Sequence, residues 1–95
     1  MSIVCILGNT DLMNYELTKH AQRVLEEREI PLEWLERALV APDLTMPDPN
    51  DSLLERCFRC IPEYDNRILR VVVNKSVVPH RIVSVFFDRT MKGRL

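Results

Sequence analysis

The sequence predicts an α+β domain in which an N-terminal helical hairpin packs on one face of an antiparallel sheet of three to four strands. Two observations carry this prediction. Residues 16–40 place apolar side chains at helical spacing, with one break at Ile30-Pro31. Residues 54–87 contain three runs rich in Val, Ile and Phe, which are typical of strands. Because helices and strands are segregated along the chain, the helices are expected on one face of the sheet.

The first half of the chain supplies the helices. Met1 to Leu7 is predicted as a short edge strand, and a turn follows it. A helix is predicted from Glu16 to Glu29, and a second from Pro31, which suits a first helical position, to Val40. Trp34 lies off the apolar line of the second helix and is expected to cover a flank of the first. The apolar stripes consist of Leu17, Ala21, Val24 and Leu25, then Leu32, Leu35 and Leu39.

The second half supplies the sheet. A Pro- and Asp-rich surface loop is predicted over Asp43 to Ser52, followed by a less buried strand over Leu54 to Ile61. Ile68 to Val73 and Ile82 to Phe87 are predicted to pair as an antiparallel hairpin, because the loop between them is too short for a parallel crossover. Alternation along these two strands turns one all-apolar face towards the helices: Leu69, Val71, Val73, Val83, Val85 and Phe87.

Length and composition bound the remaining possibilities. The 95 residues are expected to form one domain, with a hydrophobic content of 46% that is ordinary for a globular protein. No apolar run is long enough for a membrane span or a signal peptide, so a cytoplasmic protein is expected. Cys57 and Cys60 would point to opposite faces of a strand, which argues against a metal site. No phosphate-binding glycine loop occurs, so neither a nucleotide cofactor nor any other cofactor is expected.

The charge is distributed unevenly along the chain. Residues 1–66 carry six Lys/Arg against thirteen Asp/Glu, whereas residues 67–95 carry seven Lys/Arg against one acid. A basic sheet end beside acidic helices could serve as a polyanion site. Alternatively, the two surfaces neutralise each other, and charge alone favours this second interpretation.

His20 and Arg23 form the first candidate site. One turn apart on the first helix, they would place an ionisable imidazole beside a cation, a pair suited to acid–base work on a phosphodiester. The alternative is that His20 caps the edge of the core, and spacing alone favours that alternative.

The C-terminal strands carry a second set of polar side chains. Arg70 and Ser84 are expected on the half-open face of the sheet, where arginines can clamp a phosphate bidentately. Equally, Arg70 could pair with Glu26 or Glu27 of the first helix. The other candidates are expected near the strand ends: Arg81, Asp88 and Arg89.

Two segments resemble a known family. LTKHAQRVLEEREIPLEWLERAL, followed by a Pro-Asp, and RILRVVVNKSVVPHRIVSVFFDRTMKG resemble the opening and closing motifs of the family known as domain of unknown function 4258. The resemblance covers about residues 15–95 and leaves out residues 1–14. This bacterial family is similar in plan to RelE- and BrnT-like toxins of toxin–antitoxin pairs, which cleave RNA without a metal. The resemblance therefore implies an RNA substrate and an antitoxin partner.

Two functions of different class remain open at this stage. The first is a metal-independent endoribonuclease toxin in which His20 is the general acid or base, Arg23 tunes it, and Arg70 and Arg89 stabilise charge on the phosphorane. In this hypothesis Arg81, Ser84 and Asp88 would help to bind the substrate. The second is a non-catalytic module that docks a protein partner through its sheet face or its acidic helices. The absence of a strong catalytic motif favours it, and Trp34 could anchor such a surface.

Overall fold

The computed structural model describes residues 15–94 and shows an α+β fold, which confirms the predicted class. The edge strand and turn predicted within residues 1–14 lie outside the described residues. The elements follow in this order: β1 (Tyr15–Leu17), α1 (Lys19–Glu27), α2 (Leu32–Val40), β2 (Leu44–Pro47), β3 (Leu54–Ile61), the 3-10 turn η3 (Pro62–Tyr64), β4 (Arg67–Asn74), β5 (His80–Phe87) and the 3-10 turn η4 (Arg89–Met91).

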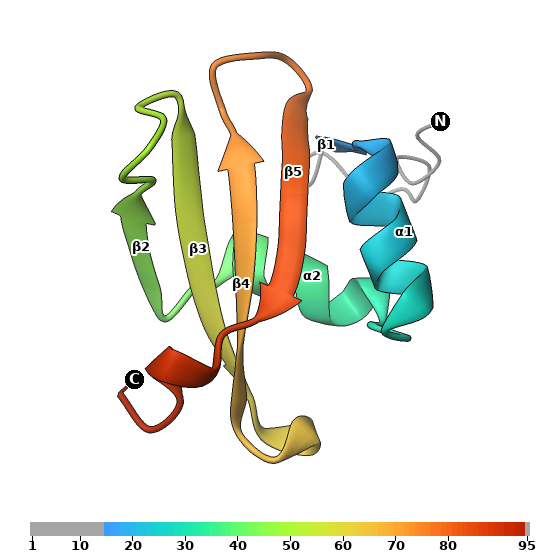
Figure 1. The fold of residues 1–95 in the computed structure, drawn as a ribbon, viewed down its shortest axis with the longest axis vertical. Helices are drawn as coiled ribbons and strands as arrows, with labels where there is room; N and C mark the ends of the chain where they lie inside the picture. The colour runs from blue at the N-terminus through green and yellow to red at the C-terminus, as the bar shows by residue number, and fades with distance from the viewer. Residues whose placement is uncertain (1–14, 95) are drawn as a thin grey trace.

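The sheet has five strands in the order β1-β5-β4-β3-β2 (Figure 1). Strands β2 to β5 are antiparallel neighbours, whereas β1 runs parallel to β5 and pairs Leu17 with Ile82. The predicted antiparallel sheet of three to four strands is therefore wrong in strand number and in direction. The two added strands are only three and four residues long, too short for alternation to reveal, and Pro47 is tolerated in β2 because that strand lies at an edge.

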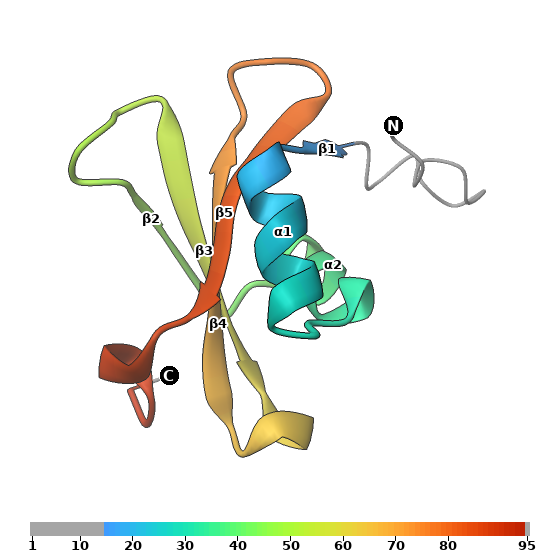
Figure 2. The same ribbon diagram turned by 45° about the vertical axis from the view of Figure 1, so that its right-hand side comes forward.

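Both helices lie on the same side of the sheet, while η4 lies on the other side (Figures 1 and 2). Helix α1 packs against β5 and β1, and α2 packs against β4 and β3. The prediction of an N-terminal helical hairpin is thus wrong in two respects. A strand precedes the helices, and the two helices pack against different pairs of strands. The apolar stripes explain this, because Ala21 and Leu25 of α1, like Leu35 and Ala38 of α2, are buried in the core under the sheet.

Helix α1 begins three residues later than predicted. The hydroxyl of Thr18 accepts a hydrogen bond from the backbone N–H of Ala21 at 3.1 Å and so caps the helix. Residues 15–17 are thereby free to extend along β5. Neither helix of the described chain is long and apolar enough to cross a membrane.

A β-bulge changes which residues of β5 face the helices. Val72 pairs with Ser84 and Val73 pairs with Ile82, so Val83 is the extra residue. Ile82 is therefore fully buried in the core, in the place predicted for Val83, which is only partly buried. The other residues predicted for the inner face belong to the core as expected: Leu69, Val71, Val73 and Val85 are buried, and Phe87 packs against them.

The opposite face of the sheet is more covered than predicted. Phe58 and Ile68 on this face are 1% and 2% exposed. Arg70 of β4 lies directly opposite Phe58 of β3 on this face. Strand β3, predicted to be less buried, is an inner strand of the sheet because β2 pairs with its outer edge.

Candidate functional site

A pocket of about 610 Å³ opens at the end of the sheet where β5 stops. Phe87, the last residue of β5, pairs with Leu69, so the first two residues of β4 continue beyond the end of its neighbour (Figure 1). The end of α1, η3 and η4 close the space around this step. The pocket is lined by Arg28, Tyr64, Arg67, Ile68, Phe86, Phe87, Asp88, Arg89 and Lys92.

Positive charge predominates in the pocket. Lys92 is paired with Asp65 at 2.9 Å. The other three cations have no ion-pair partner among residues 15–94: they are Arg28, Arg67 and Arg89. Such a surplus of guanidinium groups around one pocket suits a multiply charged anion, because each guanidinium can hold two phosphate oxygens.

Aromatic rings form one wall of the pocket. Tyr64 lies 5.5 Å from Trp34 and 5.0 Å from Phe87 between ring centroids. The guanidinium of Arg67 lies over the Tyr64 ring, 4.7 Å from its centroid. Trp34 therefore contributes to this aromatic cluster.

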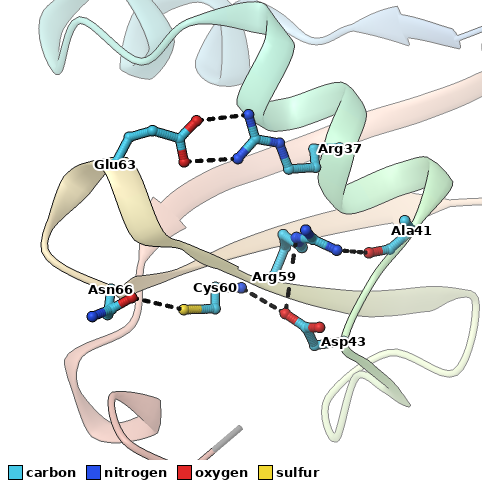
Figure 3. Close-up of polar contacts among 7 residues, drawn as sticks. All are labelled: Arg37, Ala41, Asp43, Arg59, Cys60, Glu63 and Asn66. Carbon is cyan, nitrogen blue, oxygen red and sulfur yellow. Dashed lines mark hydrogen bonds and ion pairs between the residues drawn. The ribbon is translucent and has the colours of Figure 1, made fainter.

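The turn that carries Tyr64 is fixed to α2 (Figure 3). Arg37 donates two hydrogen bonds to the carboxylate of Glu63, at 2.9 and 2.8 Å. These bonds lower the pKa of Glu63 to about 2. Asp65 and Asn66 complete the turn with positive φ angles of 58° and 54°, a conformation that Asp and Asn adopt more readily than most residues. Tyr64 is thus held in place before any ligand binds.

Asp88 anchors the other side of the pocket. Its carboxylate accepts hydrogen bonds from the backbone N–H and the hydroxyl of Thr90, at 2.9 and 2.6 Å, and from Arg70 at 3.0 Å. Burial raises the pKa of Asp88, but the bonds from Thr90 and the charge of Arg70 outweigh burial, so that the pKa is lowered. The carboxylate is therefore ionised at neutral pH and fixes the start of η4, on which Arg89 lies.

Arg70 lies behind the pocket, on the sheet face opposite the helices. It stacks on Phe86 at 4.1 Å and pairs with Asp88, so the alternative partners on α1, Glu26 and Glu27, are excluded. Burial and the charge of Arg56 lower the pKa of Arg70. Its buried Nε has no hydrogen-bond partner among the described residues. Ser84 shares this face but is not part of the pocket wall.

The remaining predicted residues lie near the other end of β5. Arg81 pairs with Glu16 at 3.8 Å beside the start of α1, where His20 and Arg23 are exposed. Six residues of strand separate Arg81 from Phe87, a distance of about 20 Å. Likewise, His20 precedes Arg28 by about 12 Å along the helix axis. The structure therefore brings Asp88, Arg89 and the supporting Arg70 together, and it places His20, Arg23 and Arg81 apart from them.

Four pocket residues had no signal in the sequence that singled them out. They come from the end of α1, from η3, from the start of β4 and from η4: Arg28, Tyr64, Arg67 and Lys92. The uneven charge along the chain indicated that a polyanion site would lie in the second half. No local sequence motif, however, links the four distant segments that contribute these pocket residues. Within residues 15–94, no three His, Cys, Asp or Glu side chains gather as a metal site would require. Cys57 and Cys60 face opposite sides of β3, as predicted.

The family model described as "Domain of unknown function (DUF4258)" matches residues 17–87. The chain belongs to this family. The DUF4258 match runs from β1 to the last residue of β5, so it includes the pocket residues contributed by α1, η3, β4 and β5. It stops before Asp88 and η4. No curated protein and no solved structure matches the chain.

Proposed function

We propose that this protein is a RelE/BrnT-like toxin: a metal-independent endoribonuclease of a bacterial toxin–antitoxin pair that acts in the cytoplasm. The observation that carries the proposal is the convergence on one aromatic-walled pocket of three arginines that have no ion-pair partner within residues 15–94. Arginines fixed around a phosphate stabilise the negative charge that develops when the phosphodiester is attacked. Such stabilisation is commonly the largest single contribution to catalysis.

The proposal places the binding of the phosphate at the pocket, because His20 lies too far from the pocket arginines to act on the same phosphate. In this proposal Arg28 and Arg89 hold the scissile phosphate, and Arg70 acts as a positioning residue by holding Asp88. A general acid or base must come within hydrogen-bond reach of the reacting proton. His20 precedes Arg28 by about 12 Å along the helix axis, so the proposal assigns it no proton transfer at the phosphate held in the pocket.

The test is expression of the full chain without a partner in a bacterial host, followed by growth and total RNA integrity. We expect growth arrest and fragmented RNA, and the purified chain should cleave RNA in the presence of EDTA. Arg89→Ala should restore growth, whereas Lys19→Ala, which removes one exposed charge at the far end of α1, should not. Normal growth and intact RNA at high expression of the wild type would refute the proposal. His20→Ala should leave cleavage unchanged, and loss of cleavage in this variant with unchanged folding would place the reaction at the His20 end and refute the role of the pocket.

A second candidate function is the non-catalytic protein-binding module. Strand β2 is an edge of the described sheet, and it exposes 40% of Met46, with 59% of Leu53 exposed in the loop that follows. An edge strand of this kind can pair with a strand from a partner. If Met46→Lys abolishes binding of a partner protein while Arg89→Ala and Arg70→Ala change no activity, the binding module is the better description.

A further inference from the structure

The aromatic wall of the pocket carries a planar cationic group, the guanidinium of Arg67. Arg67 lies over Tyr64 at 4.7 Å, and Tyr64 in turn packs against Trp34 and Phe87. A guanidinium is planar and stacks on rings through its faces. Arg67 is exposed and lines the pocket, so its guanidinium is accessible from the pocket as well as from Tyr64. A second planar group can therefore stack on Arg67 from the pocket side.

Charges suited to a phosphate lie around the same space. Arg28 closes the pocket from the end of α1, and Arg89 closes it from η4. Neither guanidinium has an ion-pair or hydrogen-bond partner for its side chain among the described residues. The pocket thus combines a stacking surface with two cations that are unpaired in the described part of the chain. Its volume of about 610 Å³ lies within the usual range for small-ligand sites.

We propose that this pocket is a subsite for one unpaired nucleotide, with its base stacked on Arg67 and its phosphate held by Arg28 and Arg89. The inference rests on the proposed function, because it names what the same site recognises in its substrate. Bases within a duplex are stacked on one another and are not free to occupy such a surface, whereas the bases of single strands are. The subsite should therefore distinguish single-stranded RNA from duplex RNA, and from a polyanion that carries no bases.

The test compares three ligands on the full chain: a 2′-O-methylated single-stranded oligonucleotide, the same strand in a duplex, and inorganic polyphosphate. Methylation blocks cleavage through the 2′-hydroxyl, so binding is measured alone. Trp34 is the single tryptophan and packs on Tyr64, so its fluorescence reports binding at the subsite. We expect the single strand to bind at least about tenfold more tightly than the duplex, in line with the strength of base stacking.

Two variants separate stacking from charge. Arg67→Lys keeps the charge but loses the planar group, so it should weaken single-strand binding about tenfold and leave polyphosphate binding nearly unchanged. Arg89→Ala should weaken the binding of both ligands and reduce the slope of log K against log salt by about 0.7 for the single strand. Lys19→Ala, which removes a charge far from the pocket, should change neither.

The outcomes distinguish this inference from the proposed function. Equal affinity for single strand and duplex, or an equal effect of Arg67→Lys on both polyanions, would overturn the nucleotide subsite. Cleavage of RNA without such selectivity would overturn the subsite and leave the ribonuclease proposal standing. Selective binding of the single strand by a chain that cuts no RNA would support the subsite and refute the ribonuclease.

Discussion

Removal of the Asp88 carboxylate is expected to destabilise the whole domain, because this group joins three elements of the structure. It is 8% exposed and accepts one charged hydrogen bond from Arg70 and two bonds from Thr90. Hydrogen bonds to charged groups contribute about 1.5–3 kcal/mol each, but bonds to one carboxylate are not additive. We therefore expect Asp88→Ala to lower the free energy of unfolding by about 2–4 kcal/mol, out of a total of about 5–15 kcal/mol.

Urea denaturation of the wild type and Asp88→Ala at several pH values measures this effect. The pKa of Asp88 is lowered in the fold from its ordinary value of 3.8. Its stabilisation is therefore fully present above that ordinary value, and it is lost as the pH falls through the lower folded pKa. The difference between the two proteins should be largest at pH 7 and should shrink below about pH 4. A difference under about 0.5 kcal/mol at pH 7, or one that does not change with pH, would refute this account of Asp88.

Two further predictions concern the bulge and the turn of Tyr64. Ile82→Ala should lower the free energy of unfolding by about 2–4 kcal/mol because Ile82 is fully buried, whereas Val83→Ala should lower it by less than about 1 kcal/mol. Equal midpoints of urea denaturation for the two variants would contradict the bulge. Because Arg37 lowers the pKa of Glu63 from 4.5 to about 2, the turn should lose its tie to α2 only as the pH falls through about 2. Trp34 fluorescence should follow that loss in the wild type and be independent of pH in Glu63→Gln, with far-UV circular dichroism as the check that the fold persists.

The sequence predicted the centre of the fold well because burial there leaves a regular pattern. Alternation placed Leu69, Val71 and Val73 on the helix face of β4, and it placed Cys57 and Cys60 on opposite faces of β3. It could not predict strands of three or four residues, whose pairing depends on distant partners. Nor could it predict the bulge in β5, because one extra residue reverses the faces before it without altering the apolar composition of the strand.

The candidate site was less accessible to sequence reasoning. Asp88 and Arg89 were identified because they follow a strand, and the end of a strand is a natural place for a site. The structure places His20 near the far end of the same strand, a separation that periodicity within one helix cannot reveal. Tyr64 and Arg67 are joined by stacking across a turn, and a turn of this kind has no periodic signal.

The charge of the whole chain proves to be a poor guide to the charge of its surface. A net charge of −1 argues against a polyanion ligand only if acids and bases are mixed evenly. Several acids are instead occupied in ion pairs with residues outside the pocket lining: Glu33 and Glu63 with Arg37, Asp48 with Arg56, Glu55 with Lys75, and Glu16 with Arg81. Local ion pairs thus neutralise part of the surface, while Arg28, Arg67 and Arg89 remain without an ion-pair partner among the described residues around one pocket. A local field of this kind attracts phosphate at short range even in a protein whose overall charge is slightly negative.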